Sequence, residues 1–267
     1  MVENKIKEQG VDTSHFIRTK EDRVGIYFAE FGALPRLSTV LYDRAGSAIS
    51  KITPEDVNWE VSLSESKVFH TTGITPALGQ SAAEATALAL KTAKEKVKLV
   101  SFDLNYRARL WSEERAQEAL TPMMKYVEIL ISTEEDAWRV FKVGGEDFKE
   151  VARKLSEKFG FKTVVITIRE NITVWRNNWA AIAYQDGKFY DDRKYELEVV
   201  DRIGSGDSFA AGFLYGYLTG EGDAERGLKY GNAAAALKHT IPGDLNWCTL
   251  SEIEELIEGE KGLRIKR

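Results

Sequence analysis

The sequence predicts a three-layer α/β/α sandwich, in which a mostly parallel sheet lies between two layers of helices. Short apolar runs rich in β-branched residues alternate with segments of helical character over most of the 267 residues. One such run, residues 196–200, leads through a glycine-paired turn into a helix of small residues. The chain has no internal repeat, low-complexity stretch or interdomain linker, so we expect residues 1–267 to form a single domain.

The order of the elements follows from local composition. Residues 1–9 have the pattern of a helix that ends at Gly10, a residue type common just after a helix C-terminus. The alanine-rich run 81–93 has a high intrinsic helix propensity. Further helices are expected at 134–141, 147–159, 208–218, 224–239 and 252–257, with Ser251 as the cap of the last. Strands are expected at 24–28, 37–42, 67–70, 98–104, 126–132 and 162–168, followed by a meander over 171–176 and 179–185.

The composition is that of an ordinary globular protein, with 43% hydrophobic and 30% charged residues. The 37 basic and 42 acidic residues give a net charge of -5, which argues against a nucleic-acid-binding surface. No apolar run approaches the ~20 residues of a membrane span, and the first residues lack a signal-peptide pattern. The single Cys248 excludes an intramolecular disulfide and suits a reducing compartment, so we expect a cytoplasmic protein with no membrane partner. The three scattered histidines offer no zinc-ligand spacing.

The turn after residue 200 carries the chemistry. Gly204 and Gly206 let the backbone bend tightly and expose N–H groups at the start of a helix, where negative charge is favoured. Asp207, an acid at an anion site, is therefore interpreted as the base of a phosphotransferase. A dinucleotide-binding turn is excluded because Phe209 stands where its third glycine is required, and no segment matches a Walker A loop. A plain strand-to-helix turn capped by the acid remains the alternative.

A wider pattern supports the phosphotransferase interpretation. Residues 201–209 match the pattern D-x-x-G-x-G-D-x-F. Its fixed positions are Asp201, Gly204, Gly206, Asp207 and Phe209. Together with the stretches 41–48, 103–107 and 237–244, this signature resembles the ribokinase-like (PfkB) carbohydrate kinases, and among them the 2-keto-3-deoxygluconate kinases. The resemblance runs along nearly all of the chain. It implies a ribokinase-like fold with a small β lid at about residues 15–48 and a core at about residues 51–267.

The resemblance also implies cofactors and partners. ATP is the expected phosphate donor, with Mg²⁺ held mainly through the nucleotide and no metal ligand expected from the protein. A monovalent cation near the carbonyl groups of Asp201 and Ile203 is compatible with the resemblance. Lid strands of this family often pair between subunits, so a homo-oligomer is expected. Where the family often has N-x-x-E, this chain reads T-E-E-D over residues 133–136.

The resemblance also implies which residues form the active site. Asp207 is the expected catalytic base, and it also contacts the substrate hydroxyl. Arg44 and Arg107 are expected to hold a substrate carboxylate, because the planar guanidinium matches it in a bidentate way. Substrate contacts are also expected from Tyr27, Tyr42 and Asp244; cross-strand packing is the alternative for the tyrosines and turn capping for the acid. The residues expected to approach the nucleotide are Asn105, Tyr106, Arg107, Thr133, Thr167, Arg169, Gly204, Ser205, Gly206 and Asn232.

These expectations add up to an ATP-dependent kinase that phosphorylates 2-keto-3-deoxygluconate at its 6-hydroxyl group. The alternatives are a kinase for a neutral sugar such as fructose or ribose, and a non-catalytic remnant that binds nucleotide. Family members open with a strand and a G-G-x-x-x-N segment, whereas this sequence begins further along, at the helix of residues 1–9. We therefore expect an N-terminally truncated domain with an incomplete lid, low stability and little kinase activity of this chain alone.

Overall fold

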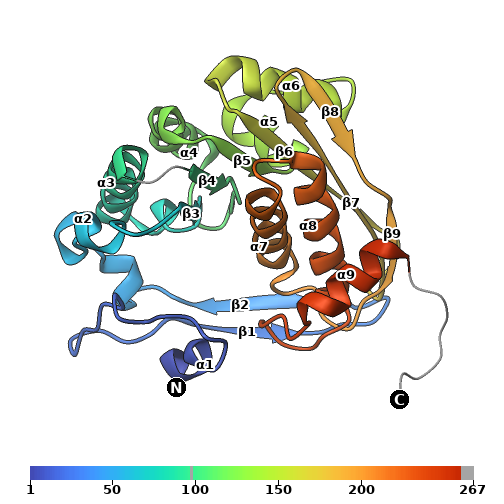
Figure 1. The fold of residues 1–267 in the computed structure, drawn as a ribbon. Helices are drawn as coiled ribbons and strands as arrows, with labels where there is room; N and C mark the ends of the chain where they lie inside the picture. The colour runs from blue at the N-terminus through green and yellow to red at the C-terminus, as the bar shows by residue number, and fades with distance from the viewer. Residues whose placement is uncertain (97–98, 260–267) are drawn as a thin grey trace.

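The computed structural model describes residues 1–96 and 99–259, and its body is built around a mixed sheet (Figure 1). The strands of this sheet are β3 (Val68–Thr72), β4 (Leu99–Asp103), β5 (Ile129–Ser132), β6 (Thr163–Asn171), β7 (Arg176–Gln185), β8 (Lys188–Asp191) and β9 (Tyr195–Glu198). They lie in the order β3-β4-β5-β6-β7-β8, and β9 pairs with β7. Strands β3 to β6 are parallel, whereas β7 is antiparallel to β6, β8 and β9. The carboxyl ends of β3 to β6 therefore meet at one edge, where ligands bind in such sheets.

Helices cover both faces of the sheet. One face carries α3 (Gln80–Lys96), α4 (Glu113–Leu120), α5 (Glu134–Phe141) and α6 (Phe148–Phe159), and the other carries α7 (Ser205–Thr219) and α8 (Ala224–His239). Side chains alternate between the two cores along a strand: Val100 and Phe102 of β4 lie in the first core, and Leu99 lies in the second. The predicted three-layer sandwich is confirmed.

A second, two-stranded sheet lies across one end of the body (Figure 1). It consists of β1 (Ile26–Glu30) and β2 (Thr39–Asp43), paired antiparallel so that Tyr27 faces Tyr42 across the strands. We call this sheet, together with the loop 31–38 and Arg44 directly after β2, the lid. It is preceded by α1 (Val2–Lys7). Short elements connect the lid to the body: 3-10 helices at Ala48–Lys51 and Pro54–Asp56, then α2 (Trp59–Ser62). Two more 3-10 helices occupy Pro76–Leu78 and Thr121–Tyr126.

Several local predictions differ from the structure. Residues 171–176 do not form a strand of their own, because β6 extends to Asn171 and turns into β7 at Arg176. The last helix, α9, spans Leu250–Glu258 and is capped by Thr249 rather than Ser251. Thr249 and Glu252 form a capping box, which satisfies backbone donors at both positions. Helix α4 and strand β8 were not predicted at all. Among residues 1–96 and 99–259, no helix combines the length and the hydropathy that crossing a bilayer demands.

Candidate active site

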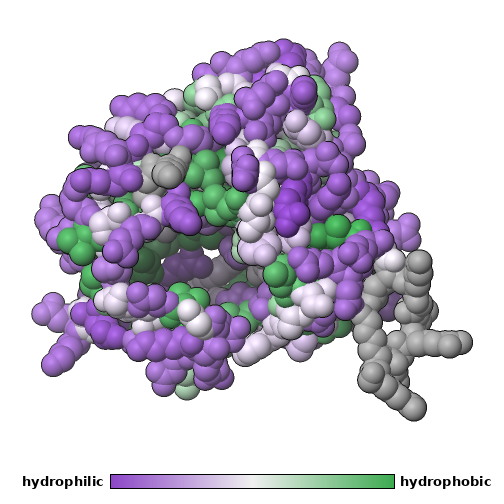
Figure 2. Space-filling view, viewed as in Figure 1, coloured by the Kyte–Doolittle hydropathy of each residue, from purple (hydrophilic) through white to green (hydrophobic). Residues whose placement is uncertain are grey.

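A cavity of about 760 Å³ separates the lid from the carboxyl edge of the main sheet. Figure 2 shows it as a hollow between the lid strands and the body. The structure brings most of the predicted site residues together around it: Tyr27, Tyr42, Arg44, Asn105, Arg107, Thr133, Thr167, Arg169, Gly204, Ser205, Gly206, Asp207 and Asp244. Lid, sheet edge and the first turn of α7 thus contribute to one site.

The glycine-paired turn forms the N-terminus of α7, which begins at Ser205, earlier than predicted. Gly204 is the N-cap, with a left-handed φ of 76° that favours glycine. A Cβ atom at this position would also overlap the carbonyl oxygen of Asp244, so the turn lies directly against that residue. Asp207 stands exposed in the first helical turn. The unpaired backbone N–H groups there can hold an anion beside its carboxylate.

Two further acids lie beside this turn. Asp103 ends β4 and Asp136 lies in the first turn of α5. Burial, together with the negative charges of Asp207 and Asp136, raises the pKa of Asp103 to about 7, although Arg107 opposes the shift. Burial also raises the pKa of Asp136 to about 6, opposed by a hydrogen bond from the Tyr106 backbone N–H at 3.3 Å. Both carboxyl groups can therefore change charge near neutral pH.

The turn that follows β4 has a strained backbone. Two of its side chains point into the cavity and one points into the core. Asn105 has a positive φ of 38°, which is uncommon for a residue other than glycine. Tyr106 points into the core, where its hydroxyl donates to the Trp111 carbonyl oxygen at 3.1 Å. Its side chain does not line the cavity, whereas Asn105 and Arg107 on either side of it do.

Three arginines from the body gather at the cavity: Arg107, Arg169 and Arg202. The Arg169 guanidinium lies 5.2 Å from the centre of the Trp179 ring, and its Nη2 donates to Ser205 Oγ at 3.5 Å. Burial lowers the pKa of Arg169, and the like charges of Arg202 and Arg107 lower it further. Mutual repulsion of this kind is relieved by a bound polyanion, and phosphate groups match arginine well.

Arg202 was not predicted as a site residue. It follows Asp201 in the signature, and its guanidinium is held by Asn171 Oδ1 at 3.3 Å and the Val174 carbonyl oxygen at 2.9 Å. Asp103 was also missed, although it opens the stretch 103–107. An acid as the last residue of a buried apolar strand was the available signal for it.

The lid contributes aromatic rings and a fourth arginine. The rings of Tyr27 and Tyr42 lie 6.0 Å apart, and the Arg44 guanidinium lies 4.8 Å from the centre of the Tyr42 ring. Burial, together with the negative charge of Asp244 and a hydrogen bond to its carboxylate, raises the pKa of Tyr27 to about 12. The Tyr27 hydroxyl therefore links the lid to the body. Both tyrosines pack against each other and line the cavity, so packing and substrate contact are compatible.

Asn232 and the two threonines have structural partners. Asn232 is fully buried, accepts a hydrogen bond from Trp179 Nε1 at 3.1 Å and donates to Asp192 Oδ2 at 3.0 Å, so the structure does not bring it to the cavity. Thr133 Oγ1 caps α5 by accepting from the Asp136 backbone N–H at 3.0 Å. Thr167 Oγ1 donates to the Ser132 carbonyl oxygen at 3.4 Å. The threonines nevertheless line the cavity.

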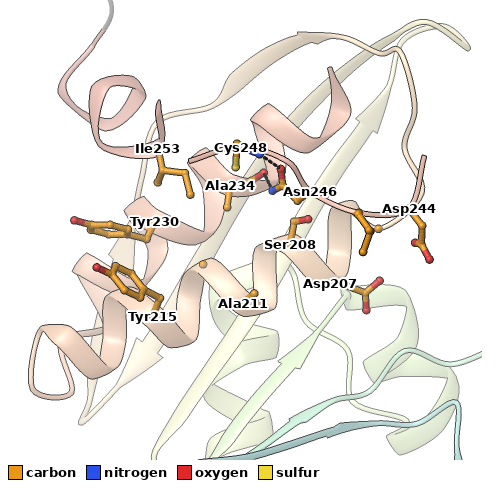
Figure 3. A pocket seen from close by; sticks show the side chains of 13 residues that line it. Asp207, Ser208, Ala211, Tyr215, Tyr230, Ala234, Asp244, Asn246, Cys248 and Ile253 are labelled. Carbon is orange, nitrogen blue, oxygen red and sulfur yellow. Dashed lines mark hydrogen bonds between the residues drawn. The ribbon is translucent and has the colours of Figure 1, made fainter. Parts of the chain in front are cut away.

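A second hollow of about 520 Å³ lies on the other side of the α7 N-terminus, between α7, α8 and α9 (Figure 3). Asn246 braces its wall by donating to the Ala234 carbonyl oxygen at 3.2 Å and accepting from the Cys248 backbone N–H at 3.1 Å. Asp207 and Asp244 line both hollows, and in Figure 3 their carboxyl groups lie on the same side of the view. The two acids therefore stand between the hollow and the main cavity.

Comparison with known proteins adds independent information. The model of the family described as "pfkB family carbohydrate kinase" matches residues 1–249. A 2-dehydro-3-deoxygalactonokinase of Haloferax volcanii is 36% identical over 259 residues, which cover 97% of this chain and 77% of that protein. A 2-dehydro-3-deoxygluconokinase of Thermoproteus tenax is 32% identical over 242 residues, covering 90% and 69% of the two chains.

Solved structures agree. The crystal structure of a 2-dehydro-3-deoxygluconokinase from Thermotoga maritima matches with a TM-score of 0.92 and 43% identity, covering 96% of this chain and 79% of that one. A putative ribokinase from Escherichia coli, solved in complex with ATP and Mg²⁺, matches with a TM-score of 0.81 over 96% and 78% of the two chains. At 22% identity, the second match shows the shared fold alone.

Proposed function

Because this chain belongs to the pfkB family of carbohydrate kinases, we propose that it transfers the γ-phosphate of ATP to the 6-hydroxyl group of a 2-keto-3-deoxy sugar acid, with 2-keto-3-deoxygluconate as the leading substrate. The observation that carries the proposal is the position of Asp207: it stands at a helix N-terminus that opens into a cavity lined by four arginines. One arginine comes from the lid and three from the body. A site of this kind suits a substrate and a cofactor that both carry negative charge.

Two arginines at the expected substrate position support a sugar acid as the substrate. Arg44 stacks over the Tyr42 ring, and Arg107 lies at the carboxyl edge of the sheet. Their planar donors can bind a carboxylate in a bidentate way, whereas a neutral ketose leaves the positive charges without a partner. The names of the relatives from Haloferax volcanii and Thermoproteus tenax favour the same substrate class. Tyr27 and Asp244 provide hydrogen-bonding groups for the sugar hydroxyls.

Asp207 acts as the general base in this proposal. Its carboxylate accepts the proton of the 6-hydroxyl group as the oxygen attacks the γ-phosphorus, so that the leaving ADP takes the bond electrons. The backbone N–H groups at the start of α7 stabilise the negative charge on the transferring phosphoryl group. Arg169 and Arg202 bind the remaining phosphates of the nucleotide. Transfer of this type depends mainly on positioning and electrostatics, which a preorganised turn provides.

Mg²⁺ fits the acids beside the turn. Within residues 1–96 and 99–259, no three histidine, cysteine, aspartate or glutamate side chains form a ready-made metal site. Asp103 and Asp136 supply hard oxygen atoms, which Mg²⁺ prefers, and their raised pKa values fall when a cation is near. We therefore propose that Asp103 and Asp136 would help to hold a Mg²⁺ ion that arrives with the ATP phosphates, and that the ion, when bound, would neutralise phosphate charge.

A substrate panel tests the proposal. ADP production is measured with 2-keto-3-deoxygluconate, 2-keto-3-deoxygalactonate, fructose and ribose, for the wild type and for Arg44→Gln, at enzyme concentrations high enough to detect the low activity expected of this chain alone. We expect the sugar acids to have the highest kcat/KM, and the substitution to reduce it about 10- to 100-fold for the acids, which corresponds to a lost charged hydrogen bond. Arg36→Gln, an exposed lid arginine outside the cavity, is the matched control and retains activity. A preference for fructose or ribose refutes the sugar-acid assignment, and ATP binding without turnover of any sugar supports the non-catalytic alternative.

A further inference from the structure

Lys238 is a charged residue that the proposed chemistry leaves unused. It lies near the C-terminal end of α8 and is fully buried, at 0% exposure. Lysine is almost never buried to this extent without a specific partner, because removing an ammonium group from water is costly. Its Nζ donates to the carbonyl oxygen of Ile241 at 2.9 Å. Burial lowers the pKa of Lys238, whereas the negative charges of Asp201 and Asp244 favour its charged form.

The surroundings of Lys238 connect the two turns that carry the candidate site. The backbone N–H of Asp201 donates to the His239 carbonyl oxygen at 3.1 Å, next to Lys238 in the chain. The buried Asp201 side chain accepts from the Ile203 N–H and the Gly243 N–H, both at 2.9 Å. Asp201 thus joins the turn before α7 to the turn that presents Asp244. Lys238, through Ile241, fixes the second turn from inside the protein.

This arrangement does not fit the monovalent cation that the resemblance allowed near the carbonyl groups of Asp201 and Ile203. The ammonium group of Lys238 already brings a positive charge to this region, where it interacts with Asp201. A second cation in the same low-dielectric interior is repelled by the first. The carbonyl oxygen of Ile241 is likewise engaged by Nζ. The Ile241 carbonyl oxygen and the Asp201 carboxylate thus surround a positive charge, and that charge is the ammonium group of Lys238.

We propose that the ammonium group of Lys238 is a built-in monovalent cation, which holds the two turns in register and makes the protein independent of K⁺ or NH₄⁺. Lys238 is a positioning residue: it acts on Asp207 and the α7 N–H groups through Asp201 and the backbone and touches no substrate. The catalytic part of this inference rests on the proposed kinase function. The structural part concerns the folded protein alone.

Thermal melting tests the structural part without any assumption about activity. Melting temperatures are measured in KCl, NH₄Cl and tetramethylammonium chloride at equal ionic strength, for the wild type, Lys238→Met and Lys229→Met. Lys229, exposed on the same helix and paired with Glu225, is the matched control. We expect Lys238→Met alone to be stabilised selectively by K⁺ or NH₄⁺. Selective stabilisation of the wild type by K⁺, or equal responses of the two variants, overturns the proposal.

Turnover tests the catalytic part. With the best sugar from the panel, we expect wild-type kcat to stay constant when K⁺ replaces tetramethylammonium. Lys238→Met should lose about 10- to 100-fold in kcat and recover part of it in K⁺ or NH₄⁺, as for lost preorganisation of a charge-stabilising site. A wild-type enzyme activated by K⁺ refutes the proposal even if the variant fails to fold. Absence of turnover with every sugar contradicts the proposed function instead, and leaves the melting experiment to decide the role of Lys238.

Discussion

At the candidate site, the charge of each carboxyl group depends on its own burial and on its charged neighbours, and Asp103 shows this most clearly. Its carboxyl group is surrounded by Asp136, Asp207 and Arg107, which push its pKa in opposite directions, and burial decides the outcome. The result is a carboxyl group whose pKa is raised to about 7, well above its ordinary value. Such a group makes the binding of a cation or a polyanion pH-dependent.

The pKa of Asp103 leads to a prediction for stability. Its folded value of about 7 lies above its ordinary value of 3.8, so the folded protein binds this proton more tightly than the unfolded chain. The free energy of unfolding therefore falls as the pH rises from about 4 to 7. Asp103→Asn removes this loss, and we expect the variant to gain about 4 kcal/mol over the wild type at pH 8 and little at pH 4.

Urea unfolding at both pH values measures this difference. Asp191→Asn, at an exposed carboxylate remote from the cavity, is the control and should show the same change at both pH values. A gain for Asp103→Asn that does not depend on pH contradicts the stated cause. Because the substitution also removes a charge from the site, we expect kinase activity to fall while stability rises, a common trade-off at functional sites.

At the scale of elements, the turn between β9 and α7 depends on a backbone shape that only glycine provides cheaply. Gly204 combines a left-handed φ with a close approach to the Asp244 backbone. Gly206 has open space where a Cβ atom would lie, and it is a helical residue. The first glycine is therefore required by packing, and the second leaves room for a ligand.

Alanine substitutions at Gly204 and Gly160 separate the cost of backbone strain from the cost of the steric clash with Asp244. We expect Gly204→Ala to lower the free energy of unfolding by about 2–4 kcal/mol, through backbone strain and the clash with Asp244. Gly160→Ala is the matched control, because Gly160 has a similar φ of 75° but free space around the missing Cβ. It should lose about 1 kcal/mol from strain alone. Equal losses for the two variants, measured by chemical denaturation, would show that contact with Asp244 is unimportant.

Elements with strong local signals were predictable from the sequence. Helix α5 and helix α8 have the predicted limits, because an N-terminal cap residue at Thr133 or Asp223 precedes each one. Strand β8 was missed although Asp186 and Gly187 form a turn with positive φ at both positions, which is a hairpin signal. Helix α4 was missed because only Ala116 and Leu120 are buried along it, too few to produce a clear period.

The candidate site was predictable where a motif fixes the spacing of its residues. Asp207 and the two glycines before it follow from the signature alone. Asp103 and Arg202 acquire their importance only when elements far apart in the sequence bring them next to Asp136 on α5 and Arg169 on β6. No local pattern in a sequence reports that kind of electrostatic neighbourhood. Their electrostatic roles therefore became visible only in three dimensions.

At the scale of the whole molecule, the lid has two chemically different faces. Its inner face lines the cavity through Tyr27 and Tyr42. Phe28 and Leu41, which pair directly across β1 and β2, alternate with these tyrosines and are 59% and 68% exposed. Exposed apolar pairs of this kind on a short sheet suit association with a second copy of the chain.

We predict that the lid is the interface of a homo-oligomer. Phe28→Ser combined with Leu41→Ser should weaken association at least tenfold, since two apolar side chains are lost from the interface. Sedimentation velocity over a range of concentrations measures this change. Val61→Ser, at an exposed apolar residue of α2, serves as the control and should leave association unchanged. A wild-type protein that remains monomeric at all concentrations refutes the prediction.

The central claim is that Asp207 accepts the proton of the sugar hydroxyl group, and Asp207→Asn tests it most directly. With the best substrate from the panel, we expect kcat to fall about 10²- to 10⁴-fold, the usual contribution of a general base. The dissociation constant for ATP, measured by calorimetry on the same preparation, should change little. A variant that turns over at close to the wild-type rate contradicts the account.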